Sequence, residues 1–143
     1  SDPTNTVVGL GTHDNYNNDD EDHIMYCWAP IPYYSSFGQY EGTGDTNGRW
    51  IYTGFLPKWI IFKTLDSVAH WVMLAKDTDE LNPRSYAMFP NTYSGGGAHP
   101  AYNVDFLSNG FKIRGTDVHN LNNETHVYAA FAENPFKLAR AGH

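Results

Sequence analysis

Short runs of apolar, aromatic and β-branched residues, separated by turn residues, occur along most of the chain. No long segment repeats its apolar positions with the 3.6-residue period of an amphipathic helix. The pattern therefore predicts an all-β protein, an antiparallel β-sandwich. We expect its strands at residues 49–53, 58–64, 69–74, 85–89, 104–107, 111–114 and 126–132.

Three local patterns add detail to this sandwich. Residues 58–64 are almost continuously apolar, which predicts a strand buried on both faces between two layers. Ser108-Asn109-Gly110 separates two strand-like runs, and the Asn-Gly pair predicts a tight hairpin that uses positive φ angles. Gly54 and Pro57 bracket a corner where the chain leaves one strand and enters the next.

The two ends of the chain resemble each other. A shift of 103 positions gives six identities among the nineteen residues from 14 to 32. The identical pairs are Asp14 and Asp117, Asn17 and Asn120, Glu21 and Glu124, His23 and His126, Ala29 and Ala132, and Pro32 and Pro135. This similarity predicts a tandem array with a period near 100 residues. The alternative is that two edge strands of one sandwich share a composition.

The repeat predicts three parts of the chain. Residues 1–32 form a terminal hairpin that resembles the end of a preceding repeat, residues 33–137 form the sandwich module, and residues 138–143 form a C-terminal tail. Within the hairpin, Ile24, Tyr26 and Trp28 alternate against Met25 and Cys27, so we expect Cys27 to fill a core. A lone cysteine excludes an intrachain disulfide and any multi-cysteine metal site.

Composition narrows the classes of function. The chain has 143 residues, with 9 Lys and Arg against 16 Asp and Glu, for a net charge of −7. This balance argues against a nucleic-acid binder, which needs a basic surface to meet phosphates. No apolar run approaches the roughly 20 residues that span a bilayer, so membrane insertion is not expected. Aromatic residues make up 15% of the chain, which favours a well-packed globular module.

Several motifs together resemble a known family. They are Tyr26-Cys27-Trp28-Ala29, Ser36-Phe37-Gly38-Gln39-Tyr40, Tyr52-Thr53-Gly54-Phe55-Leu56-Pro57, Asp105-Phe106-Leu107-Ser108-Asn109-Gly110-Phe111 and Tyr128-Ala129-Ala130-Phe131-Ala132-Glu133. The chain from about residue 12 to residue 137 resembles the concanavalin-like or SPRY-like sandwich modules of bacteriophage tail-fibre and virion adhesion proteins. The resemblance implies a concanavalin-like or jelly-roll sandwich located in a virion, with a trimer as the expected homo-oligomer. It implies no catalytic residue.

The chain carries no recognisable pattern of catalytic residues. Glycan-cleaving sandwiches need two carboxylates facing each other across a cleft, yet the five glutamates are scattered along the chain. The closest cluster, Asp77 with Asp79 and Glu80, falls in a turn-like stretch, and no Gly-x-Ser-x-Gly elbow exists. We therefore expect no enzymatic activity.

One acidic run is a candidate metal site. Asp19, Asp20 and Asp22 lie in the densest group of oxygen ligands in the chain, and Ca²⁺ takes six to eight oxygens. The run lacks the glycine of an EF-hand loop, so the alternative is a solvated hairpin end. The histidines have no paired spacing of the kind that binds zinc.

Aromatic residues near glycines are the candidate ligand-binding residues. Tyr93, His99 and Tyr102 surround a glycine tract, as in binding loops, and Trp50 follows as a further candidate. The alternatives are a mobile connection for the loop and a core position for Trp50.

These observations predict a non-enzymatic virion module that recognises a host-surface glycan or receptor and contacts other tail proteins. Net charge favours a neutral or cation-bridged saccharide over an anionic one. Two alternatives stay open, namely a structural spacer or decoration protein and a polysaccharide depolymerase.

Overall fold

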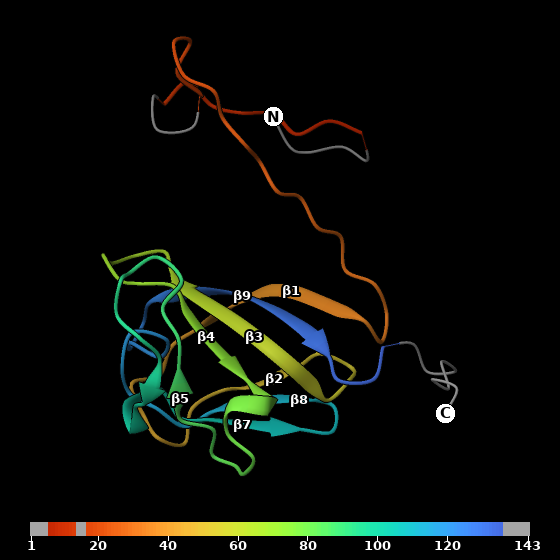
Figure 1. The fold of residues 1–143 in the computed structure, drawn as a ribbon, viewed down its shortest axis with the longest axis vertical. Coiled ribbons are helices and arrows are strands. Elements are labelled where there is room, and N and C mark those ends of the chain that lie inside the picture. The colour runs from red at the N-terminus through yellow and green to blue at the C-terminus, as the bar shows by residue number, and fades with distance from the viewer. Residues whose placement is uncertain (1–5, 14–16, 136–143) are drawn as a thin grey trace.

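The computed structural model describes residues 6–13 and 17–135, which fold mainly into antiparallel strands (Figure 1). The strands are β1 (Ser35–Glu41), β2 (Trp50–Tyr52), β3 (Pro57–Thr64), β4 (Val72–Ala75), β5 (Tyr86–Ala87), β6 (Gly97–Ala98), β7 (Val104–Leu107), β8 (Gly110–Ile113) and β9 (Thr125–Ala132). Two 3₁₀ turns, η1 (Lys76–Thr78) and η2 (Pro100–Tyr102), accompany them. The all-β fold predicted from the sequence is confirmed. No helix in the described part of the chain is long and apolar enough to cross a bilayer.

Two sheets form the body of the molecule. One has four strands in the order β1-β9-β3-β4, and the other has three in the order β2-β8-β7. A two-stranded sheet, β5-β6, lies beside them (Figure 1). All pairings are antiparallel.

The core lies between the inner faces of the two larger sheets. Phe62 of β3 meets Phe111 of β8 at a ring-centroid distance of 5.6 Å, and both side chains are fully buried. Around this pair the two sheets contribute alternate residues, as expected for facing pleated surfaces. The buried apolar residues are Tyr40, Ile51, Phe55, Ile60, Phe62, Val72, Leu74, Ala87, Val104, Phe106, Phe111, Ile113 and Ala130.

Strand β1 was not among the strands expected from the pattern. Its sequence contains Ser35, Ser36, Gly38 and Gln39, which have little strand propensity. In the structure, all seven of its residues pair with β9. The pairing partner, and not the local sequence, makes this segment a strand.

Strand β3 differs from the expectation of burial on both faces. Ile60, Phe62 and Thr64 are buried, whereas Trp59 and Ile61 on the opposite face are only half-buried. The prediction of burial on both faces is wrong because, among the described residues, no second sheet covers this face. The four-stranded sheet therefore has an apolar outer surface.

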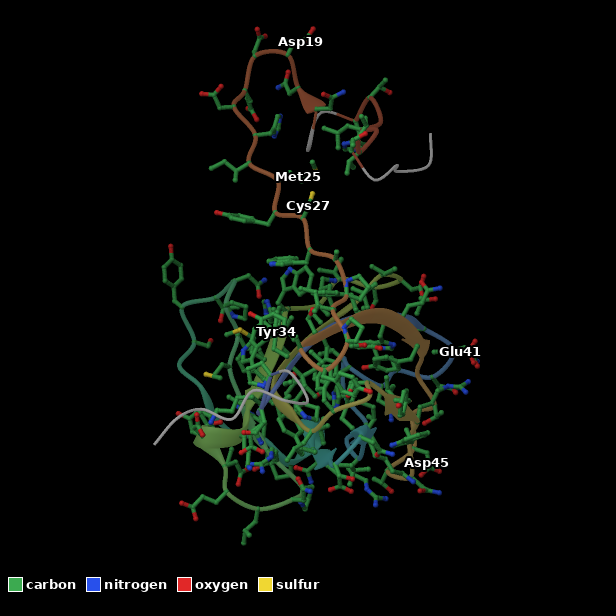
Figure 2. The ribbon with its side chains drawn as sticks, turned by 90° about the vertical axis from the view of Figure 1, so that its right-hand side faces the viewer. Asp19, Met25, Cys27, Tyr34, Glu41 and Asp45 are labelled. Atoms are coloured by element: carbon green, nitrogen blue, oxygen red, sulfur yellow. The ribbon has the colours of Figure 1, made fainter. Side chains whose placement is uncertain are left out.

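The N-terminal segment does not form the predicted hairpin within its described residues. Residues 6–13 and 17–30 contain no strand and extend away from the sandwich (Figures 1 and 2). Cys27 is exposed, so its predicted place in a core is wrong. None of the strands that the structure describes pairs with residues 6–13 or 17–30, and an isolated pair of strands is only marginally stable in water. The predicted tail, residues 138–143, lies outside the described residues.

The turn between β7 and β8 forms as expected but for a different reason. Leu107 pairs with Gly110, which leaves Ser108 and Asn109 as a two-residue turn. Neither Asn109 nor Gly110 has a positive φ angle. Glycine is required at position 110 because a Cβ there would lie 2.1 Å from the carbonyl oxygen of Ile51. The corner glycine, Gly54, does have a positive φ of 83°.

Replacing Phe62 with alanine should lower the free energy of unfolding by about 3 to 5 kcal/mol, because the change opens a cavity between the two sheets. Urea unfolding followed by tryptophan fluorescence measures this loss. Val68→Ala is the control, since Val68 is fully exposed and its truncation should change the free energy by less than about 0.5 kcal/mol. Equal effects of the two changes would contradict the assignment of the core.

Candidate functional site

An aromatic pair lies on the outer face of the three-stranded sheet. Trp50 and Tyr52 occupy alternate positions of β2, with Ile51 between them buried in the core. Trp50 is 49% exposed and Tyr52 is 64% exposed. Their ring centroids are 5.9 Å apart and the ring planes meet at 61°. Two neighbouring aromatic rings are thus open to solvent on a rigid strand.

Polar side chains flank this pair. Lys112 faces Trp50 across the β2-β8 ladder, and its Nζ donates to Oδ1 of Asn47 at 2.7 Å. On the other side of β8, Asp105 accepts a hydrogen bond from Nε of Arg114 at 2.7 Å. The outer face of this sheet therefore combines flat apolar rings with amide, ammonium, guanidinium and carboxylate groups.

Such a surface can bind a saccharide without a deep pocket. An aromatic ring offers a flat apolar face to the C–H groups of a pyranose, and polar groups beside it bind the hydroxyls. We call Trp50, Tyr52 and Lys112 with Asn47 the β2-β8 face. Trp50 was predicted as a ligand-binding residue, and the structure places it here, exposed. Its neighbours Tyr52, Lys112 and Asn47 were missed.

The missed residues left a weak signal in the sequence. Trp50 and Tyr52 have the two-residue spacing of one strand face, and Ile51 between them points to the core. Lys112 could not be found from spacing, because its position opposite Trp50 depends on the register of β2 with β8.

The predicted Tyr93–Tyr102 loop is divided by the structure. Tyr93 is fully exposed in the connection between β5 and β6. Tyr102 instead packs against the core, with its ring 5.6 Å from Phe89 and 5.8 Å from His99. Burial, with a smaller contribution from Asp117, raises the pKa of Tyr102. Of the two predicted ligand-binding tyrosines of this loop, Tyr93 is therefore exposed and Tyr102 is a packing residue.

The acidic run is not assembled into a metal site by the described residues. Asp19, Asp20 and Asp22 are exposed on the extended N-terminal segment, and Figure 2 shows Asp19 at its far end. The backbone N–H of Asp20 donates to Oδ1 of Asn18 at 3.3 Å. Among described residues, no three His, Cys, Asp or Glu side chains are grouped so that they could hold a metal ion.

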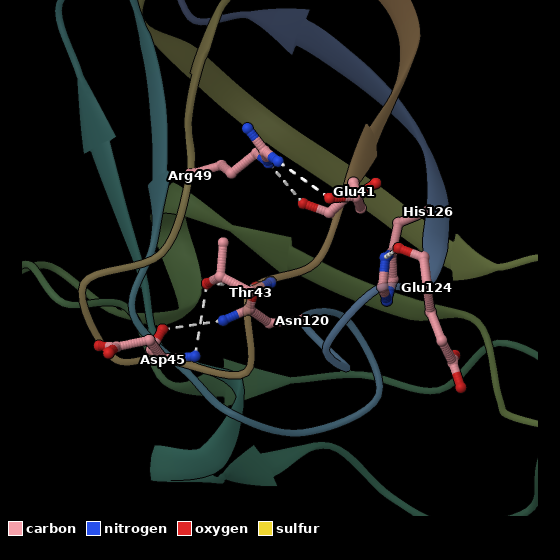
Figure 3. Close-up of polar contacts among 7 residues, drawn as sticks. All are labelled: Glu41, Thr43, Asp45, Arg49, Asn120, Glu124 and His126. Atoms are coloured by element: carbon pink, nitrogen blue, oxygen red, sulfur yellow. Dashed lines mark hydrogen bonds and ion pairs between the residues drawn. The ribbon is translucent and has the colours of Figure 1, made fainter.

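A second concentration of polar groups closes one end of the sandwich (Figure 3). The buried Asn120 accepts a hydrogen bond from the backbone N–H of Thr43 at 2.9 Å. Its Nδ2 donates to the carbonyl oxygens of Asp45 and Gly115 at 2.9 and 2.8 Å. Arg49 donates to Glu41 nearby at 3.1 Å. These contacts bind the loop before β9 to the loop after β1.

His126 and Glu124 extend this cluster along β9. The buried ring of His126 stacks on Tyr40 at 5.1 Å, and its nitrogens lie 2.9 and 3.1 Å from the carbonyl oxygens of Glu124 and Val118. The carboxylate of Glu124 accepts hydrogen bonds from Thr64 at 2.7 Å and from Ser67 at 2.9 Å. The side chains of this cluster contact groups inside the protein, so the role of the cluster is to hold the fold together.

His119 is the exception among the buried polar residues. It is 1% exposed, and neither ring nitrogen makes a hydrogen bond. Burial lowers the pKa of His119 to about 3; the backbone of Asn103 offsets part of this effect, and His126 adds to it. Burial also lowers the pKa of His126, against opposing effects of its backbone partners. His119 is a neutral core residue and has no access to a substrate.

An apolar groove runs along the outer face of the four-stranded sheet. It has a volume of about 1100 Å³ and lies between the sheet and the N-terminal segment. Trp59, Ile61 and Phe131 line it from the sheet. Trp28 lines it from the segment and stacks on Phe37 with ring centroids 6.1 Å apart. The groove is thus formed partly by a segment that has no strand partner.

Comparison with known families gives one match. Residues 1–135 match the family described as Domain of unknown function (DUF7483). The chain belongs to this family. The match includes the extended N-terminal segment as well as the sandwich, so both are parts of the DUF7483 domain. No curated protein matches the chain, and no solved structure does either.

Stability should fall as the pH is lowered from about 6.5 toward 3. In this interval His119 stays neutral in the folded protein, whereas in the unfolded chain it binds a proton below its ordinary pKa of about 6.5. Protonation of this group therefore stabilises the unfolded state by about 1.4 kcal/mol for each unit by which the pH falls. Urea unfolding at pH 7 and pH 5 measures the loss. His119→Leu should reduce it and His70→Leu, at an exposed site, should not. Identical pH dependence in both variants would refute the assignment.

Truncation of the two loop tyrosines should separate their roles. Tyr102→Ala removes a ring that packs against the core and should lower the melting temperature by several degrees. Tyr93→Ala removes a fully exposed ring and should leave it within about 1 °C. Differential scanning calorimetry measures both changes. Equal melting temperatures for the two variants would mean that Tyr102 contributes no packing.

Proposed function

We propose that this DUF7483 domain is a non-enzymatic recognition module of a bacteriophage virion that binds a host-surface glycan. It would act as a tail-fibre-like part, in contact with other virion proteins and presented in several copies. The resemblance of its motifs to phage adhesion modules supports the place in the virion. The exposed Trp50–Tyr52 pair is the observation that supports saccharide binding.

The geometry of the pair fits a shallow sugar site. Exposed rings of this size on a strand add little to the packing of the core, and they lower solubility. A role in recognition explains why they are present. Lys112 and Asn47 hold each other in place beside Trp50, which fixes two hydrogen-bonding groups at the edge of the ring. A shallow site of this kind binds weakly. Several linked copies raise its avidity by roughly 10² to 10⁴ without new contacts.

Charge limits the kind of glycan. The chain carries a net charge of −7, so a strongly anionic polysaccharide is repelled at low salt. Lys112 and Arg114 are positive groups on the β2-β8 side of the molecule, and Arg114 is already paired with Asp105. A neutral hexose-containing glycan therefore fits this face better than an acidic one.

The double change Trp50→Ala and Tyr52→Ala should lower binding of labelled protein to host cells by at least about tenfold, because both stacking surfaces are removed. The melting temperature should change little, since both rings are half-exposed or more. Binding is measured by flow cytometry on candidate host cells, with and without periodate oxidation of their glycans. Periodate should abolish binding by the unmodified protein.

Trp71→Ala is the matched control, since Trp71 is an exposed tryptophan on the other sheet's side of the molecule. It should leave cell binding unchanged. Binding that survives the double change at full strength would refute the β2-β8 face as the site. Release of reducing sugars from host polysaccharide would instead favour a depolymerase.

A structural role in the virion is the second candidate. The observation that favours it is the apolar groove between the N-terminal segment and the four-stranded sheet, which is better suited to protein contacts than to sugars. A protein with this role alone would join virus particles and bind neither cells nor free glycans.

A further inference from the structure

Residues 22–29 have the sequence of a strand but no strand partner among the described residues. Residues 17–21 before them form turns, whereas residues 22–29 are extended (Figure 1), and Ile24, Tyr26 and Trp28 are 81%, 74% and 65% exposed. Three large apolar side chains at alternate positions are costly to leave in water. Alternate positions lie on one face of a strand in a sheet. The sequence of the segment therefore suits a place in a sheet, which the segment does not have here.

Three of the four residues that segment 17–29 shares with the C-terminal part are those that anchor β9. Asn17, Glu21 and His23 are identical to Asn120, Glu124 and His126 under the shift of 103. In the sandwich, Asn120 binds three backbone groups, Glu124 binds two hydroxyls and His126 stacks on Tyr40. Asn120 and His126 are fully buried.

In the N-terminal segment the same side chains have only local contacts. Asn17 and His23 are exposed; Nδ2 of Asn17 donates to the carbonyl oxygen of Gly11, and Nε2 of His23 accepts from the backbone N–H of Asn18. Glu21 is exposed as well. A similar composition of two surface strands would not explain why these three positions are identical. In the sandwich, the residue type at each of them is fixed by hydrogen bonds and packing inside the protein.

The apolar residues also follow the two faces of β9, except that Tyr26 stands where β9 has the small Ala129. Ile24 and Trp28 correspond to Val127 and Phe131, which lie on the outer face of the sheet and line the groove. On the inner face, Cys27 corresponds to the fully buried Ala130. Cys27 is larger than Ala130. Its extra volume is offset because Met25, an adaptable side chain, takes the place of the bulkier Tyr128 on the same face.

The place of β9 is a slot between two strands. β9 pairs with β1 on one side and with β3 on the other, so a sandwich without it has two unpaired strand edges and an open core. A segment that takes this place gains backbone hydrogen bonds on both sides, which is the mode of binding by strand addition.

We propose that residues 22–29 are a donor strand and that residues 17–21 form the loop before it. The donor strand binds between the first and third strands of the sandwich unit that precedes this one in the polypeptide, in the place that β9 takes here. Pro32 and Pro135 are identical under the same shift, so β9 of one unit would lead through a proline into β1 of the next. The inference does not depend on glycan binding, and the failure of either leaves the other intact.

The experiment uses a two-unit chain made from this protein's own residues, with residues 33–116 joined directly to residues 14–143. The join preserves the shift of 103, so residues 17–29 follow the first unit where residues 120–132 follow it in the native chain. The second unit keeps all nine strands described here. It therefore folds whether or not the first unit accepts the donor strand.

Cys27, the only cysteine of the native chain, reports on the result. In the native chain it is exposed and should react with a thiol reagent at the rate of a free thiol. In the two-unit chain it takes the place of the buried Ala130 and should react at least about 100-fold more slowly, until urea unfolds the first unit.

Two substitutions in the two-unit chain make the test specific. His23→Asp places a charge where His126 is buried, and should restore rapid reaction of Cys27. Asp19→Asn, at the position of Asn122, is the control and should keep Cys27 protected. A Cys27 that reacts as fast in the two-unit chain as in the native chain overturns the proposal, including the case in which the first unit stays unfolded.

Discussion

The position of β9 between β1 and β3 is the constraint on which the rest of this sandwich depends. β1 has few residues that favour a strand, and it is a strand because all seven of its residues pair with β9. β3 contributes the central core residues Ile60 and Phe62, and pairs with β9 over most of its length. Without β9 the four-stranded sheet would be divided into separate parts.

Buried polar residues fix β9 in this position. Asn120, Glu124 and His126 lie in or just before the strand. Asn120 and Glu124 bind groups from distant parts of the chain, and His126 stacks on Tyr40 of β1. Unpaired, such groups would cost free energy inside the protein, so they tolerate one register only. They therefore contribute specificity of pairing more than net stability. The N-terminal segment has the same three residue types at the same spacing, and this is why its sequence resembles that of β9.

The two sheets present different outer surfaces. On the three-stranded sheet, the Trp50–Tyr52 pair lies among polar and charged groups, a combination that suits a hydrated ligand such as a sugar. On the four-stranded sheet, Trp59, Ile61 and Phe131 form an apolar surface beside the extended segment, a combination that suits protein contacts. Recognition at one face and assembly at the other are compatible with one module.

The sequence by itself determined the all-β class, seven of the nine strands and the β7-β8 hairpin, because these follow from alternation and turn residues that act locally. It also identified Trp50 as a ligand-binding candidate and revealed the similarity of residues 14–32 to residues 117–135. Only the tertiary structure decided that β1 is a strand, that one face of β3 is uncovered and that Tyr102 packs while Tyr93 does not. It also placed Lys112 beside Trp50 and left Cys27 exposed. Each of these depends on which segment lies next to another, and pairing between residues far apart in the chain is not written in the local pattern.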